Sequence, residues 1–152
     1  MSNKEPVDPK EQIKHLMCLP KAFLGSSASR DGDIFPAVSL VIPALNGIGR
    51  PILLLSDLSD HVRNLRGDPR ASLLFDGTSG MAEPLTGPRV TVLGKVSVTE
   101  DLGDRMAYLA QHPSAALYAD FRDFHFYLFV PQEALLVAGF GRIHRFDAAD
   151  LA

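Results

Sequence analysis

Short apolar segments separated by turn residues make up most of the chain. Within several of them apolar side chains recur at every second position, the spacing of a half-buried β-strand. Prolines and glycines are scattered between the segments, and there are no tandem repeats or low-complexity tracts. This pattern predicts a β-rich fold with many turns. The expected strands cover residues 22–29, 34–45, 51–55, 71–75, 89–99, 124–130, 134–138 and 143–146.

Helical spacing is confined to a few stretches between these strands. The strongest pattern lies at 100–111, where Leu102, Met106 and Leu109 are expected to face inward. Another helix is expected behind an Asp-Pro start at Asp8. The expected helices cover residues 8–18, a short segment around 62–65, 100–111 and 115–121.

Four side chains have an expected position within these elements. Gly94 lies where the strand 89–99 is expected to bend. His125 and Tyr127 alternate with apolar neighbours and are expected on the more exposed face of their strand. The single cysteine, Cys18, is expected to be a small buried apolar side chain.

The order of elements predicts a mainly β (α+β) fold. Seven or so short strands with a few helices between them favour a closed or nearly closed antiparallel barrel. The spacing gives no alternating β-α-β units, so a parallel sheet is not expected. A length of 152 residues fits a single domain over 1–152, with a core from about 8 to 147.

Composition narrows the possible partners. The formal net charge of −3, from 15 basic and 18 acidic side chains, argues against nucleic acid, which needs a basic face. No apolar run has the length of a membrane span, and the first residues lack the pattern of a signal peptide. One cysteine excludes an internal disulfide and indicates a reducing, cytoplasmic environment. The histidines show no metal-ligand spacing, so no metal site is expected.

The main candidate site follows the apolar run 51–55. A strand, a hydroxyl-rich turn and the start of a helix form a geometry that collects anions, because the first helical N–H groups have no partner within the helix. Ser56, His61, Arg63 and Asn64 add donors close to that point, so a phosphate is the expected guest.

A purely structural interpretation of this segment also stands. Serine or aspartate before a short helix is commonly an N-cap, and Arg63 can be a solvated cation. Asp57 and Asp60 favour the helix N-terminus electrostatically, can pair with His61, and repel a nearby phosphate. Asp123 can tie the preceding helix to the next strand. The residues alone leave both interpretations open.

The motifs, taken in order, resemble the flavin-binding split-barrel family of pyridoxamine 5′-phosphate oxidase, nearest the branch with bacterial haem-utilisation proteins. The resemblance runs from about residue 24 to residue 146. The residues that carry it are Pro36-Ala37-Val38-Ser39, Leu54-Leu55-Ser56-Asp57-Leu58, His61-Val62-Arg63-Asn64-Leu65, Asp68-Pro69-Arg70-Ala71-Ser72-Leu73-Leu74, Arg89-Val90-Thr91-Val92-Leu93-Gly94, His112-Pro113, Asp120-Phe121-Arg122-Asp123-Phe124 and Gly139-Phe140-Gly141.

This resemblance implies an antiparallel Greek-key split barrel that forms a homodimer with flavin mononucleotide (FMN) at the interface. The flavin ring would lie along the strand that holds Val38, Ser39 and Leu40, with its phosphate near the segment chosen above. Arg89 would be a further flavin contact, or else a surface cation at a strand start. The resemblance also implies that Phe140, Arg142 and His144 approach the site of the partner subunit.

Three functions remain open from the sequence. The first is an FMN-dependent oxidoreductase, in which the flavin supplies the electron chemistry and the protein orients it; no catalytic residue is assigned. The second is a haem-binding or haem-degrading protein on the same fold, with His61 or His144 as the iron ligand. The third is a dimeric module without cofactor. The small-molecule substrate is not identified.

Overall fold

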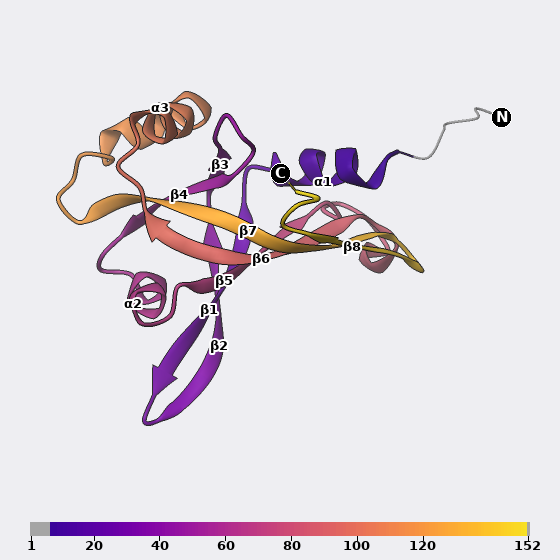
Figure 1. Ribbon diagram of the computed structural model, residues 1–152, viewed down its shortest axis with the longest axis horizontal. Coiled ribbons are helices and arrows are strands. Elements are labelled where there is room, and N and C mark those ends of the chain that lie inside the picture. Colours follow the sequence, from indigo (N-terminus) through magenta and orange to yellow (C-terminus); the bar gives the residue numbers. More distant parts are fainter. Residues whose placement is uncertain (1–6, 152) are drawn as a thin grey trace.

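The computed structural model describes residues 7–151 (Figure 1). Eight strands, three α-helices and two 3-10 helices alternate along the chain. The strands are β1 (Ala22–Arg30), β2 (Asp33–Val41), β3 (Pro43–Leu45), β4 (Pro51–Ser56), β5 (Arg70–Asp76), β6 (Arg89–Val98), β7 (Phe124–Gly139) and β8 (Arg142–Asp147). The helices are α1 (Pro9–Met17), α2 (Asp60–Gly67), η1 (Pro84–Thr86), α3 (Leu102–Gln111) and η2 (Pro113–Leu117).

The strands form one antiparallel sheet in the order β2-β1-β5-β6-β7-β4-β3. The long β7 is the centre of this arrangement: its first part pairs with β4, and its last part pairs with β8. The expectation of a mainly antiparallel β fold with short flanking helices is confirmed. No parallel pair is present among the described strands.

Two apolar clusters stabilise the sheet. The larger fills its inner face, where α1 and α2 also pack, and it includes the fully buried Leu24, Phe75 and Phe129. The smaller lies between the sheet and α3, around Tyr108 and Phe126. Because hydrophobic burial is the main favourable term in folding, these clusters fix which face of each strand is inside.

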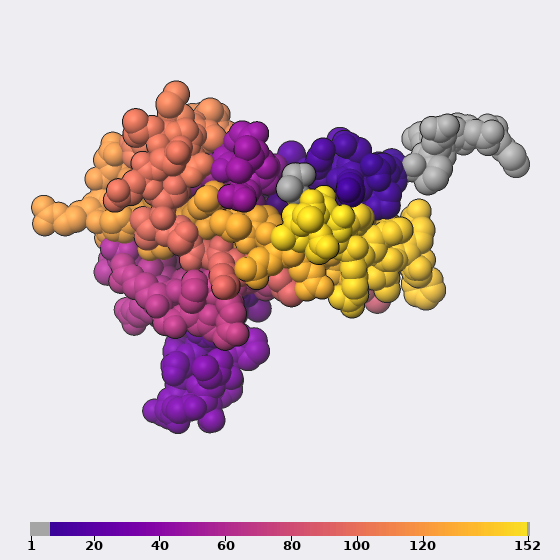
Figure 2. Space-filling model, viewed as in Figure 1, coloured from indigo at the N-terminus to yellow at the C-terminus, as the bar shows by residue number. Residues whose placement is uncertain are grey.

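The hairpin of β1 and β2 extends away from the rest of the molecule (Figures 1 and 2). Its strands pair from Ala22↔Val41 to Arg30↔Asp33, but β1 pairs with β5 only as far as Gly25. The hairpin turn contains Asp31 at φ 49° and Gly32 at φ 85°, the left-handed conformations that such turns require. Beyond Gly25 the hairpin is therefore an arm whose outer strand is an edge of the sheet.

The strand β7 is continuous, so the expectation of two strands separated by Pro131 is wrong. Gly94 of β6 pairs with Pro131, but its neighbour Leu93 pairs with Glu133, which leaves one extra residue in β7. This β-bulge accommodates a proline, which has no N–H to donate to the ladder. The register shift falls at Gly94, where the sequence predicts a bend, and this bulge keeps β7 continuous.

The expected strand 34–45 is two strands, β2 and β3, separated at Ile42. The backbone at this break and along β3 bonds to side chains of α3 and the residue after it. Tyr108 Oη donates to Ile42 O at 2.8 Å, His112 Nε2 donates to Pro43 O at 2.8 Å, and Gln111 bonds to both the N–H and the carbonyl of Leu45. Helix side chains thus take the place of a neighbouring strand.

The orientation of α3 also corrects an expectation. Leu102 and Met106 are 73% and 70% exposed, while Asp104 and Tyr108 are buried. Asp104 accepts bonds from Asn46 Nδ2 and Thr99 Oγ1, so hydrogen bonding to the β3–β4 turn decides which side of the helix faces the sheet. Apolar spacing alone does not carry that information.

Two further side chains lie elsewhere than expected. Tyr127 is only 4% exposed, because β7 is covered on both of its faces. His125, its neighbour on the same face by spacing, is partly exposed at the start of the strand. Cys18 is exposed rather than buried, since it follows α1 as the C-cap residue.

Candidate functional site

The turn between β4 and α2 is held together by its own polar groups. Ser59 donates to Ser56 O through both its N–H, at 3.0 Å, and its hydroxyl, at 2.6 Å. The N–H of Leu58 donates to Ser56 Oγ at 3.2 Å. Ser59 is the N-cap residue of α2, but its hydroxyl makes no capping bond. This compact turn fixes where α2 begins.

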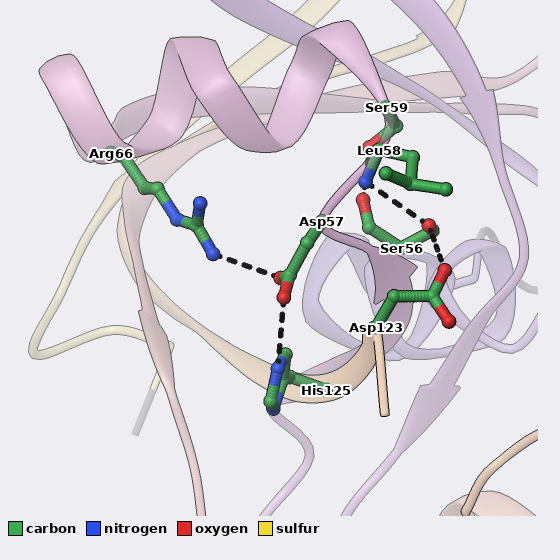
Figure 3. A network of polar contacts seen from close by, with 7 residues as sticks. All are labelled: Ser56, Asp57, Leu58, Ser59, Arg66, Asp123 and His125. Carbon is green, nitrogen blue, oxygen red and sulfur yellow. Dashed lines mark hydrogen bonds and ion pairs between the residues drawn. The ribbon is translucent and has the colours of Figure 1, made fainter. Parts of the chain in front are cut away.

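Side chains of α2, of β7 and of the residue before β7 anchor the same turn (Figure 3). Ser56 Oγ donates to Asp123 Oδ2 at 2.8 Å. Asp57 accepts from Arg66 Nη2 at 2.9 Å and from His125 Nε2 at 3.1 Å. One carboxylate therefore joins the turn to the end of α2 and to the start of β7, so the helix that carries His61 is held at both ends.

The Asp57 link predicts a measurable loss when its charge is removed. In Asp57→Asn we expect the free energy of unfolding to fall by about 1 kcal/mol, because two charge-assisted bonds weaken in a partly exposed setting. Urea denaturation would measure this. Asp60→Asn is the matched control. Asp60 is 74% exposed, and its ion pair with the exposed Arg63 is long, at 3.7 Å. Equal effects of the two variants would contradict the role given to Asp57.

Two of the four residues expected to bind a phosphate are held by hydrogen bonds within the chain. Ser56 bonds to Asp123, and the buried Asn64 donates from Nδ2 to Ser26 Oγ at 3.1 Å. Arg63 is 69% exposed beside Asp60 and is free to turn toward a ligand. The structure thus places Ser56 and Asn64 in the scaffold and leaves His61 and Arg63 available.

His61 lies at a hollow of about 360 Å³. Its walls come from β2, β4, α2, α3, the residue after η2 and the start of β7, and most of them are aliphatic or aromatic. We call it the His61 hollow; it is lined by Leu40, Val41, Ile42, Leu54, Leu55, His61, Tyr108, Tyr118 and Phe124. Among the described residues, no carboxylate lines it.

Burial in this hollow lowers the pKa of His61 below 6.5, and the nearby Asp60 carboxylate only partly opposes that shift. The imidazole is therefore neutral at physiological pH, with a nitrogen lone pair to offer. A neutral imidazole is a good metal-ion ligand and a weaker partner for a phosphate than a cation is.

The three residues expected along the flavin ring lie on the outer strand β2. Val38 and Leu40 are 73% and 60% exposed and share one face of the strand with Ile42, whereas Ser39 faces the other side and is half-buried. Leu40 and Ile42 also line the His61 hollow. An exposed apolar strip thus leads out of the hollow along β2.

The remaining predicted residues do not meet His61 within one chain. Arg89 lines a different hollow, of about 300 Å³, where its guanidinium donates to Leu85 O and Gly87 O. Phe140, Arg142 and His144 lie on β8 and the turn before it, on the opposite side of the molecule from α2 in Figure 1. Phe140 is 85% exposed, and Arg142 Nη2 donates to Ala138 O at 3.4 Å.

Sequence reasoning missed the aromatic wall of the His61 hollow. Tyr108, Tyr118 and Phe124 all line it. Tyr118 and Phe124 are in ring contact, with centroids 5.0 Å apart, and Phe121 packs against Phe124 at 6.3 Å. The aromatic residues at every third position from 118 to 124 are the signal that could have pointed to this wall.

Residues 7–151 contain neither a metal-binding cluster nor a membrane-spanning helix. No group of three or more His, Cys, Asp or Glu side chains in this part of the chain is arranged to hold a metal ion. None of the helices described there combines the length and the apolar character needed to span a membrane.

Comparison with known proteins gives a consistent picture. Residues 26–151 match the family described as "CREG, beta-barrel". The chain is 33% identical over 136 residues to the non-canonical haem oxygenase HOZ, chloroplastic, of Arabidopsis thaliana; this covers 88% of the chain but 41% of that protein. The chain thus spans about two fifths of the length of this curated relative.

Solved structures show the same fold. A haem-binding protein from Mycobacterium smegmatis is 29% identical with a TM-score of 0.85, over 96% of this chain and 60% of that one. A protein of the pyridoxinephosphate oxidase family from Clostridium acetobutylicum is 14% identical with a TM-score of 0.68, over 96% and 100%. Campylobacter jejuni ChuZ is 18% identical with a TM-score of 0.76, over 93% and 59%. The expected split-barrel fold is confirmed.

Proposed function

The chain belongs to the CREG β-barrel family, and from this premise we propose that it binds haem in the His61 hollow, with His61 as the iron ligand. The observation that carries the proposal is a single imidazole of lowered pKa within walls that are otherwise aliphatic and aromatic. A neutral imidazole is a common ligand of haem iron, and an apolar wall suits a porphyrin face. Similarity to a haem oxygenase and a haem-binding protein supports the same ligand.

The chain's own side chains have separate roles in this site. His61 provides the nitrogen ligand, and the Asp57 network holds the helix that carries it. Leu40 and Leu54 line the hollow and would place aliphatic surface against the porphyrin. Haem, when bound, supplies redox chemistry at its iron. The similarity to a haem oxygenase extends the proposal to turnover of the bound haem by O₂ and a reductant.

FMN, expected from the sequence, is the second candidate. Two observations favour it: Arg63 is exposed next to His61, and the strip with Val38 and Leu40 offers a flat apolar face to a flavin ring. Against it, Ser56 and Asn64 bond within the scaffold, and Asp57 and Asp60 put negative charge at the turn where the phosphate would lie. We therefore place haem first.

We also propose that the site is completed in a homodimer. A hollow of about 360 Å³ is at the small end for ligand sites, which commonly hold roughly 300–1,000 Å³. Exposed apolar side chains in a row are uncommon on a monomer and mark contact surfaces. Along β2 and at the residue after it they are Ile34, Phe35, Val38, Leu40 and Ile42. A second copy would also supply Arg89, Phe140, Arg142 and His144 from the other side of the barrel.

A charge on β2 is expected to dissociate this dimer. In Val38→Asp the carboxylate would be buried between the two copies, so we expect the mass in solution to fall to that of one chain at micromolar concentration. Light scattering coupled to size-exclusion chromatography would measure it. Leu102→Asp is the matched control, because Leu102 is also 73% exposed but lies on α3. A Val38→Asp variant that is still a dimer would contradict the proposed interface, and so would a wild-type chain that is a monomer.

Absorbance spectroscopy tests the choice of ligand. Purified protein is titrated in parallel with haemin and with FMN, and unbound ligand is removed by gel filtration. The haem proposal expects a Soret band that saturates at one haem per chain, with FMN passing through unbound. Retained FMN with no Soret band would replace haem by flavin as the ligand, and retention of neither would favour a module without cofactor. Loss of the Soret band on adding ascorbate in air would report haem turnover.

A further inference from the structure

The polar groups of the His61 hollow are few, and their hydrogen bonds can be assigned one by one. Apart from His61, the lining contains two phenol groups, those of Tyr108 and Tyr118. Tyr108 Oη donates to Ile42 O at 2.8 Å, so the fold itself uses this hydroxyl. Within residues 7–151, the hydroxyl of Tyr118 has no hydrogen-bond partner in the chain, although the wall around it is mostly apolar.

The ring of Tyr118 is held in place. Tyr118 follows η2, and its N–H donates to Ala115 O at 3.1 Å. Its ring packs against Phe124 at 5.0 Å between centroids, with the planes inclined by 54°. Phe124 in turn contacts Phe121. A side chain supported in this way loses little rotamer entropy when a ligand binds, which is the property of a pre-organised contact.

The two phenols line the same hollow, where Tyr108 is buried and Tyr118 is half-buried. Burial raises the pKa of Tyr108, and the proximity of Tyr118 raises it further. Tyr108 already donates its hydroxyl proton to Ile42 O, so Tyr118 carries the phenol of this hollow whose donor no group of residues 7–151 uses. A donor that the fold leaves unused in an apolar wall is available to a ligand.

We propose that the Tyr118 hydroxyl donates a hydrogen bond to an anionic acceptor atom of the group bound in the His61 hollow. The inference rests on the proposed haem site and adds a residue that selects what binds there. Two sources have this chemistry: a carboxylate on the rim of the haem, or an anion bound to the iron. In either case Tyr118 discriminates between ligands with and without that acceptor.

The test replaces one atom and compares matched ligands. Tyr118→Phe keeps the ring against Phe124 and removes the hydroxyl. Dissociation constants are measured for haemin, for haemin dimethyl ester, which has no free carboxylates, and for azide and fluoride on the ferric haem complex. Tyr127→Phe is the matched control, because Tyr127 is buried in the larger apolar cluster and does not line the hollow. Thermal melting verifies that both variants fold.

Each outcome decides the proposal. If the acceptor is a haem carboxylate, Tyr118→Phe weakens haemin binding about tenfold and leaves the dimethyl ester unchanged. If it is an iron-bound anion, the variant weakens fluoride and azide binding by a similar factor. Unchanged constants for all four ligands would overturn the role of Tyr118 and leave the haem site standing. A wild type that takes up no haemin would overturn both.

Discussion

Haem affinity is expected to fall by on the order of 100-fold when His61 is replaced by alanine. Substituting a residue that only hydrogen-bonds to a metal ligand already lowers metal affinity by roughly 10–100-fold, and His61→Ala removes the proposed iron ligand itself. The Soret band should shift to that of a complex without a protein nitrogen ligand. Haemin titration followed by absorbance measures both effects. Added imidazole should restore the original spectrum, since the hollow keeps its other walls.

The control is the other histidine expected as a ligand. Within one chain His144 lies on β8, on the opposite side of the molecule from α2 (Figure 1), and in the proposed dimer the second copy would bring it to the site without a bond to the iron, so His144→Ala should keep the iron–imidazole spectrum. His15, exposed on α1, serves as a surface control. If His144→Ala abolished the spectrum and His61→Ala did not, the iron ligand would belong to β8 and the role of His61 would be contradicted.

The lowered pKa of His61 predicts that the free energy of unfolding depends on pH. Because burial lowers the pKa of His61, the folded chain takes up its proton at a lower pH than the unfolded chain, which does so near 6.5. The unfolded state thus binds more protons in this window, and the free energy of unfolding should fall as the pH drops below about 6.5. Urea denaturation at pH 7.5 and 5.5 measures the fall. It should be smaller in His61→Ala; an identical fall in both proteins would contradict the assignment.

A second large effect is expected at Gly94, on the stability of the barrel. In Gly94→Ala the new Cβ would overlap Val130 O and lie 2.7 Å from the ring of Phe129. The carbonyl is backbone of the paired strand and Phe129 is fully buried, so neither can move freely. Overpacking of this kind costs about 3 kcal/mol. Thermal or urea unfolding would measure it.

Gly47→Ala is the matched control for this substitution. It lies in the β3–β4 turn, and its added Cβ would meet nothing within 4 Å. Its stability should change by less than about 0.5 kcal/mol. A Gly94→Ala variant as stable as Gly47→Ala would mean that β6 and β7 can separate at the bulge without cost.

Local chemistry made parts of the fold predictable from sequence. Asp8 before Pro9 gave the start of α1, and its carboxylate does accept from Lys10 N. Gly94 marked the bulge. The side of α3 that faces the sheet is set by a non-local contact. Asp104 bonds to Asn46, 58 residues away, and this contact outweighs the apolar spacing of Leu102 and Met106. A hydrogen bond between residues so far apart in the sequence leaves no signal in the spacing of apolar residues.

The candidate site, too, could be predicted from the sequence only in part. The turn after β4 was located from its strand, serines and helix start, and His61 was singled out there. The residues that hold the turn, Asp123 and His125, come from β7 and the residue before it, some 67 positions later in the chain. The sequence could not show that Ser56 and Asn64 bond within the scaffold, because their partners are set by the folded barrel.

The side chains of α3 that bond to β3 have a consequence for assembly. An uncovered sheet edge invites the addition of a foreign strand and growth into fibrils. At β3 and the residue before it, the carbonyls of Ile42, Pro43 and Leu45 already accept hydrogen bonds from side chains, so this border is a poor template for another strand. The opposite border, β2, bears Pro36, which has no N–H. One end of the sheet is therefore closed to polymerisation, and the other is left for a partner that recognises side chains more than backbone.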